Sequence, residues 1–246
     1  MTKRKILLLA MSLCMVAILA VGGTLAYFTA EDEADNVFTI GYVDIELEET
    51  FEQFSDLVPG LDINKDVYVK NTGSNPAYVR VHIAIPADMD DGDPSFNASK
   101  NFLHFNFTNE SVADGQWSWL AEYSTGTGYD TAKKWNYYET SIDGEDYAVY
   151  VVTYRSQLAK GTQTKTQALD KVYLDKTVNA VKNEDGTVTY TDTKGNTITM
   201  TPDETGKSTL EIKVWAEATQ VETFENAYDA LNTAFGVPGT YSPWDE

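Results

Sequence analysis

Apolar and polar residues alternate with a period of two along most of this chain. The alternation is clear over residues 43–48, 67–70, 79–85, 103–107 and 210–216. Successive side chains of a β-strand point to opposite faces, so the pattern predicts strands that bury one face. Turn-forming residues at 57–60 and 71–76 separate these runs, and the strands on either side of 71–76 are predicted to pair as a hairpin.

The second half of the chain continues the pattern. Residues 147–154 read as a buried strand, 168–174 as the strand after it, and 187–200 as a Thr-rich hairpin that we expect to protrude. Apolar residues then recur at three- and four-residue steps from Val221 to Phe235 and stop at Gly236. This spacing predicts a short C-terminal helix.

Many short strands, regular turns and a single helix predict an all-β fold. We expect an antiparallel two-sheet β-sandwich of the jelly-roll type, with a short C-terminal helix and irregular insertions. No Pro-, Gly- or Ser-rich linker interrupts residues 27–246, so one domain is predicted there. Within it, 87–145 is an insertion and 183–203 is the protruding hairpin.

The first 26 residues have the pattern of a signal peptide. Three basic residues at 3–5 precede an uncharged run that ends near Leu25, and small side chains at Thr24 and Ala26 suit a signal peptidase. We expect cleavage between Ala26 and Tyr27, contact with the membrane only before that step, and secretion to the matrix or cell surface. A run of this length also fits a permanent anchor, but Gly22 and Gly23 favour cleavage.

Composition excludes several classes of partner and chemistry. The net charge of −20, which becomes −23 once the three basic residues of the leader are removed, argues against nucleic acid and anionic lipid as partners. Cys14 is the only cysteine and lies in the predicted leader, so the processed chain has no disulfide, thiolate metal site or cysteine nucleophile.

The candidate metal ligands are few. The two histidines, His82 and His104, lie outside any His-Glu-x-x-His motif, and both are expected on the face opposite the apolar residues of their strands. The acidic loop at 88–93 is a candidate Ca²⁺ site, although a solvated loop without a bound ion is the better interpretation. Its carboxylates belong to Asp88, Asp90, Asp91 and Asp93. No catalytic residue and no other cofactor is predicted, so we do not expect an enzyme.

Aromatic residues gather in the predicted insertion. They are Trp117, Trp119, Trp135, Tyr137 and Tyr138. Such a group forms either a sugar-stacking platform or part of the core of a β-sandwich, and the spacing does not separate the two interpretations.

The order of several short motifs resembles the TasA/camelysin family of exported biofilm-fibre proteins of Gram-positive bacteria. These motifs are the leader end at 22–28 with 34–41, which is similar to the signature processed by the SipW-type signal peptidase, and the stretches 57–60, 70–74, 158–161 and 217–220. The last stretch is expected to follow the final strand. The resemblance implies a jelly-roll subunit that polymerises with itself, head to tail, into extracellular fibres.

In such fibres the segment freed by signal cleavage adds as a strand to the neighbouring subunit, which for this chain implies residues 27–40. This segment carries Tyr27, Phe28, Val37, Phe38 and Ile40, which favour an apolar groove, and acidic residues that keep it soluble while unpaired. The alternative is an N-terminus without fixed structure or the first strand of the domain itself.

Three functions are therefore compared. The first is a secreted structural protein of the biofilm matrix that assembles by strand donation. The second is a cell-surface glycan-binding module or adhesin that uses the aromatic insert. The third is a camelysin-like metallopeptidase, which the absence of a zinc-protease motif disfavours.

Overall fold

The fold is known from a computed structural model that describes residues 42–51, 58–89, 100, 102–106, 115–123, 136–202 and 211–244. All of these residues belong to one compact unit, Gly41–Glu246. The predicted signal peptide and the predicted donor segment, residues 27–40, lie outside the described residues.

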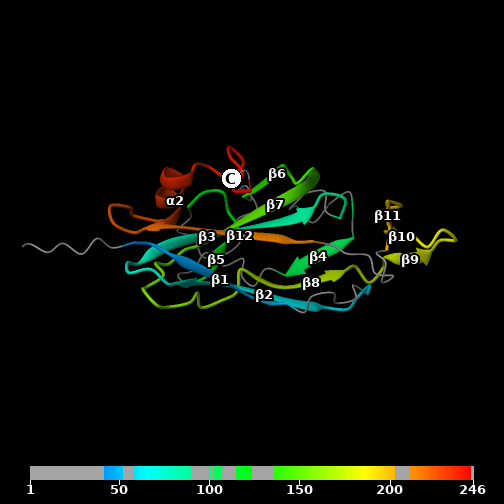
Figure 1. Cartoon of the computed structure of the whole chain (residues 1–246), viewed down its shortest axis with the longest axis horizontal. Helices are drawn as coiled ribbons and strands as arrows, with labels where there is room; N and C mark the ends of the chain where they lie inside the picture. Colours follow the sequence, from blue (N-terminus) through cyan, green and yellow to red (C-terminus); the bar gives the residue numbers. More distant parts are fainter. Residues whose placement is uncertain are drawn as a thin grey trace, which may run out of the picture. The chain divides into compact units, whose positions relative to one another are not determined.

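Nearly all the regular structure is β-strand. The strands are β1 (Ile45–Phe51), β2 (Ile63–Asn71), β3 (Ala77–Pro86), β4 (Leu103–Asn106), β5 (Trp117–Ser118), β6 (Tyr137–Ile142), β7 (Glu145–Tyr154), β8 (Leu169–Leu174), β9 (Asn179–Lys182), β10 (Val188–Thr191), β11 (Thr197–Met200) and β12 (Lys213–Gln220). The helix α2 (Ala227–Phe235) follows the last strand (Figure 1).

Two antiparallel sheets form the body of the unit. One has the strand order β1-β2-β8-β4, and the other has the order β12-β3-β7-β5, with β6 also paired to β7. Apolar side chains of β2 and β8 in the first sheet and of β3 and β7 in the second share one buried cluster. The structure thus confirms the predicted all-β sandwich with a short C-terminal helix.

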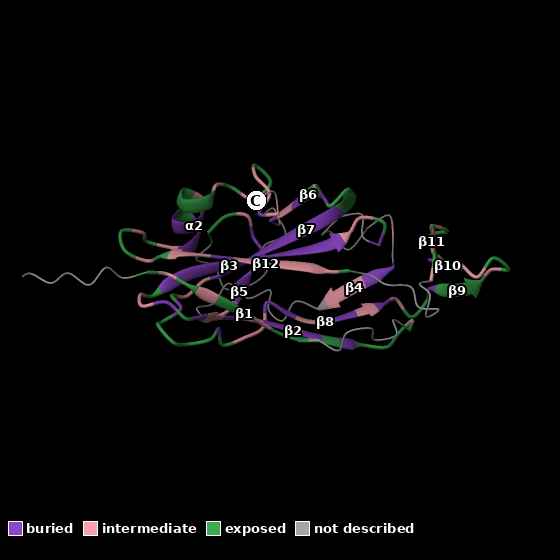
Figure 2. Ribbon diagram, in the orientation of Figure 1, coloured by how far each residue is buried: buried purple, intermediate pink, exposed green. Residues whose placement is uncertain are grey.

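The strand β3 is buried on both of its faces. Nine of its ten residues are buried, because Val81 and Ile83 face the core between the sheets while Arg80 and His82 face the opposite side. On that opposite side α2 and the segment after it cover the sheet, with Leu231 packed against Tyr78 and Trp244 packed beside the buried residues of β7. Figure 2 shows β3 and β7 almost entirely in the colour of buried residues.

The predicted hairpin across residues 71–76 is wrong. β2 pairs with β1 and β8, whereas β3 pairs with β12 and β7, so this turn carries the chain from one sheet to the other. A turn of this length can join neighbours in one sheet or bridge the roughly 10 Å between packed sheets. The buried Asn71 stabilises the turn as it is observed: its Nδ2 donates to the carbonyl oxygens of Asn75 and Leu158, at 2.8 and 2.9 Å.

The C-terminal elements begin later than predicted. The last strand is Lys213–Gln220 rather than 210–216, so the stretch 217–220 lies within the strand and not after it. The helix begins after its N-cap Asn226, whose side-chain oxygen accepts from the Asp229 N–H at 3.0 Å. Val221 and Phe224 fit the helical spacing because they pack against the buried face of α2 from the preceding loop.

The region 183–202 contains the predicted hairpin, β10 with β11, and β9 adds a third strand to it. No residue of these three strands is buried. Tyr190, Ile198 and Met200 are partly buried and pack against the core cluster, so one face of this small sheet touches the sandwich.

Candidate functional site

The sequence-predicted site residues fall mostly outside the described residues. These include Ala26 and Tyr27 at the cleavage site, the donor residues Phe28, Val37, Phe38 and Ile40, and three of the four acidic loop residues, Asp90, Asp91 and Asp93. The fourth, Asp88, is exposed in the turn after β3. The donor segment and the Ca²⁺ loop therefore stay predictions.

The described residues do contain two strands with an unpaired edge on the same side of the sandwich. β1 pairs with β2 and β12 pairs with β3, and within the described part of the chain neither has a second strand partner. β1 and β12 contact each other across the two sheets. Together they form what we call the β1/β12 seam (Figure 1).

Along the β1/β12 seam several apolar side chains that pack against the core are only partly covered. The half-buried residues that pack there against the core are Val43, Ile45 and Leu47 at β1 and Ile212, Val214, Ala216 and Ala218 at β12. In Figure 2 β12 has the colour of intermediate burial along most of its length, in contrast to its neighbour β3. A further strand along this seam would find both unpaired backbone groups and apolar contacts.

A buried polar network lies on the outer face of the second sheet, under α2 and the C-terminal segment. Its centre is the ion pair between Arg80 Nε and Glu217 Oε2, at 2.5 Å, on the adjacent strands β3 and β12. Arg80 is 1% exposed and Glu217 is 5% exposed. A buried charge is costly unless an opposite charge lies beside it, so Arg80 and Glu217 each require the other in the folded protein.

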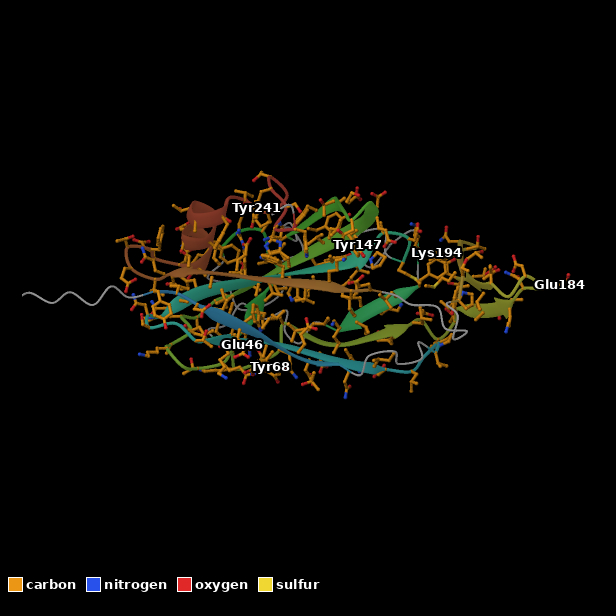
Figure 3. All side chains as sticks on the ribbon, viewed as in Figure 1. Glu46, Tyr68, Tyr147, Glu184, Lys194 and Tyr241 are labelled. Atoms are coloured by element: carbon orange, nitrogen blue, oxygen red, sulfur yellow. The ribbon has the colours of Figure 1, made fainter. Side chains whose placement is uncertain are left out.

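Arg80 also connects the sheet to the C-terminal elements. Its Nη1 donates to Asn232 Oδ1 in α2 at 2.9 Å, and its Nη2 donates to the Gly236 carbonyl at 3.1 Å and to the Tyr241 hydroxyl. The Tyr241 hydroxyl in turn donates to both carboxylate oxygens of Glu217, at 2.7 and 2.9 Å. Figure 3 labels Tyr241 in the segment that follows α2.

His82 completes the network as a neutral side chain. Its Nε2 lies 3.3 Å from Glu217 Oε2, and its Nδ1 lies 3.0 Å from the Tyr138 hydroxyl. These contacts suit a tautomer in which Nε2–H donates to Glu217 and Nδ1 accepts from Tyr138. Burial lowers the pKa of His82 below its ordinary value of 6.5, against the opposing pull of the Glu217 carboxylate.

The pKa values of the two acidic side chains in the network, Glu217 and Tyr241, shift in opposite directions. Burial by itself favours a higher pKa for Glu217, but the hydrogen bonds from His82 and Tyr241 and the charge of Arg80 outweigh it, so the pKa lies below 4.5. Burial raises the pKa of Tyr241, so that its hydroxyl stays protonated and continues to donate. The network therefore holds one carboxylate against one guanidinium, with neutral donors around them.

The placement of His82 corrects the expectation of an exposed strand face. His82 is 0% exposed because α2 and the C-terminal segment cover the outer side of its strand, and rings of Tyr138, Tyr241 and Trp244 surround it edge-on. His104 lies in the other sheet, partly exposed, with its Nε2 3.0 Å from Asp175 Oδ2.

This arrangement does not fit a protease zinc ion. Within the described residues no group of three or more His, Asp or Glu side chains is placed to hold a metal. The one carboxylate beside His82 already binds Arg80, whose positive charge opposes a cation at the same oxygen. The two histidines, in different sheets, have separate partners.

The aromatic group divides between the core and the surface. Trp117 and Trp119 are 1% and 3% exposed within the core, and Trp117 Nε1 donates to the Thr166 carbonyl at 2.9 Å. Tyr138 is also buried, Tyr137 is partly buried, and Trp135 lies outside the described residues. Trp117 and Trp119 therefore offer no ring face to a sugar.

Sequence reasoning missed the pairing of Arg80 with Glu217. Both residues interrupt apolar stretches of their strands, at Val79-Arg80-Val81 and Ala216-Glu217-Ala218, and that was the available signal. A charge between two apolar neighbours also fits a solvent-facing position on a half-buried strand. The sequence does not distinguish a buried charge from a solvent-facing one. The structure does, because it places α2 over this face of the sheet.

Comparison with known proteins supports the resemblance. The family model described as camelysin metallo-endopeptidase matches residues 1–93. No curated protein matches the chain. Among the described residues, no helix has the length and apolar character needed to cross a membrane. Over residues 1–93 the chain is therefore similar to the TasA/camelysin family, whose members are in general exported proteins.

Proposed function

We propose that this protein is a secreted structural component of the extracellular matrix, which polymerises when its processed N-terminal segment pairs with a second copy. Similarity to a family of exported proteins and the leader pattern of residues 1–26 support export. The protein then acts outside the cell as a fibre subunit rather than as a peptidase.

The β1/β12 seam is the observation that carries this proposal. Two strand edges lie next to each other, and the apolar side chains along both are only half covered. An exposed strand edge with apolar neighbours is a template for pairing with another chain. A donated strand would bury these side chains and pair the open backbone groups in one step.

The composition of residues 27–40 suits the incoming strand. Aromatic and β-branched residues at 27, 28, 37, 38 and 40 supply apolar contacts, while four acidic residues at 31, 32, 33 and 35 keep the unpaired segment soluble. Each subunit would receive one such strand and donate another. Because this contact joins two different surfaces of the subunit, it does not close on itself, and the assembly grows as a filament.

The experiment compares two chains, one beginning at Tyr27 and one beginning at Tyr42. We expect fibres from the first in electron micrographs, and monomers from the second by size-exclusion chromatography. Circular dichroism checks that both fold. A third chain, which begins at Tyr27 and carries Val37→Asp and Phe38→Asp, has the full length but lacks two apolar anchors, and we expect it to remain monomeric.

Two results would overturn the proposal. One is the absence of fibres from the Tyr27 chain across a range of salt and pH. The other is equal fibre formation by the Tyr42 chain, which would place the polymer contact elsewhere in the molecule.

A further inference from the structure

The first described residues of the chain are bound to one turn of the sandwich. Tyr42–Asp44, which we call the strand root, lies against residues 72–75 of the turn between β2 and β3. The Thr72 and Gly73 N–H groups both donate to the Asp44 carbonyl at 3.0 Å. The Ser74 and Asn75 N–H groups donate to the Tyr42 carbonyl, at 2.9 and 3.3 Å.

A side chain adds to these backbone bonds. The Tyr42 N–H donates to Ser74 Oγ at 2.8 Å, and the same hydroxyl lies 3.3 Å from the Tyr42 carbonyl oxygen. The Tyr42 side chain is 59% exposed, so the root is held through its backbone rather than by burial of its ring. Hydrogen bonds to both the N–H and the carbonyl group of Tyr42 fix the direction in which the chain arrives.

Gly73 is required by the close approach of the strand root. A Cβ atom at this position would lie 2.6 Å from the Asp44 nitrogen and 2.7 Å from the Tyr42 carbonyl oxygen. Both are backbone atoms, which cannot rotate away as a flexible side chain does. Gly73 does not have a positive φ, so its backbone conformation is open to other residues and contact with the root is what demands glycine.

Hydrogen bonds of the buried Asn71 side chain hold the turn in place. This side chain is fully buried; its Oδ1 accepts from the Gly73 N–H at 2.9 Å, and its Nδ2 donates to two carbonyls, one in the turn and one at Leu158. The turn is therefore held by the sandwich whether or not the strand root is bound to it.

We propose that the turn 71–75 is an anchor for the strand root, and that it fixes the point of the sandwich from which a strand donated to a second copy of this chain begins. This inference rests on the proposed function. A strand that slips by one residue turns its apolar side chains to the wrong face, so a donated strand requires a fixed origin. A root released from the turn would leave the donated strand without a fixed origin, so we expect it to pair with the second copy more slowly.

The test uses Gly73→Ala in the chain that begins at Tyr27. Its Cβ displaces the strand root, so we expect faster amide hydrogen exchange at residues 42–45 and fibre elongation slowed by about tenfold, as the loss of one or two hydrogen bonds implies. Circular dichroism should show a folded sandwich. Thr72→Ala is the matched control, because Thr72 is exposed and contributes only its backbone N–H, and it should behave as the unmodified chain.

A second, milder variant tests the anchor in case Gly73→Ala impairs folding. Ser74→Ala removes only the hydroxyl contacts to Tyr42, and we expect it to shift both readouts in the same direction by a smaller factor. Unchanged fibre elongation in Gly73→Ala, with rapid exchange at the root, would overturn the anchor while leaving the proposed function intact. Absence of fibres from the unmodified chain would instead overturn the proposed function.

Discussion

At the scale of single residues, Arg80 connects the second sheet to α2 and to the segment that follows the helix. It binds Glu217 on β12, Asn232 in α2, and Gly236 and Tyr241 beyond the helix. Its guanidinium also lies 5.7 Å from the ring centres of Phe235 and Tyr241. The planar five-donor geometry of arginine serves all these partners at once, which a lysine cannot do.

Neutralising Glu217 should destabilise the fold. Glu217→Gln leaves the buried Arg80 charge without a carboxylate, so we expect the free energy of unfolding to fall by about 3 kcal/mol in urea titrations. Glu211→Gln is the control, because Glu211 is 71% exposed in its side chain and pairs with Lys213 at 3.5 Å, and it should cost less than about 1 kcal/mol. Equal losses in the two variants would contradict the role given to the buried pair.

The buried neutral His82 predicts acid sensitivity. Its folded pKa lies below 6.5, so the unfolded chain takes up a proton first as the pH falls. The stability that His82 contributes is therefore present above about pH 6.5 and is lost as the pH falls from there toward the folded pKa. Thermal melts should give a lower Tm at pH 5.5 than at pH 7.5.

Two histidine variants test whether His82 causes this drop in Tm. His82→Gln should reduce the drop in Tm between the two pH values, while His104→Gln, at the partly exposed histidine of the other sheet, should keep it. Glu217 adds a loss of the same sign at lower pH, because its folded pKa lies below 4.5. An undiminished drop in His82→Gln would show that other groups cause it.

At the scale of elements, the two-residue strand β5 illustrates how burial decides the role of an aromatic side chain. Trp117 pairs with Tyr154 across β5 and β7, their rings lie 5.1 Å apart, and both belong to the core cluster. Tyr123, a few residues later, is 44% exposed and covers the Arg155 guanidinium at 5.0 Å. The same aromatic-rich stretch thus supplies both core and surface.

Truncating Trp117 should therefore affect folding rather than ligand binding. Trp117→Ala is expected to lower the free energy of unfolding by about 3–5 kcal/mol, because it leaves a large cavity in the core. Tyr123→Ala, the exposed counterpart, should cost far less in the same denaturation experiment. A stable Trp117→Ala protein that had lost the ability to bind glycans would favour the adhesin hypothesis instead.

At the scale of the whole unit, the two ends of the described chain are held to the sandwich in different ways. The strand root is bound to the turn at the end of the first sheet, while the segment after α2 is pinned to the outer face of the second sheet by Tyr241 and Trp244. The segment after α2 is thus held by partly buried side chains, whereas the strand root is held through backbone hydrogen bonds.

The sequence by itself determined which stretches become strands. Along β2, buried residues such as Val67 and Val69 alternate with less buried ones, and the order of apolar and polar residues in the sequence shows the same alternation. The same reasoning located the helix and its end at Gly236, where φ is 99°. The family resemblance was likewise inferred from the sequence without coordinates, and the match over residues 1–93 supports it.

Only the tertiary structure decided the strand partners and the burial of charged groups. The turn after β2 crosses between sheets, and Arg80 meets Glu217 from 137 residues away. Such contacts depend on which sheet each strand joins and on what covers its second face. That choice results from packing energy summed over the whole core, whereas alternation along one strand reports only that one of its faces is buried.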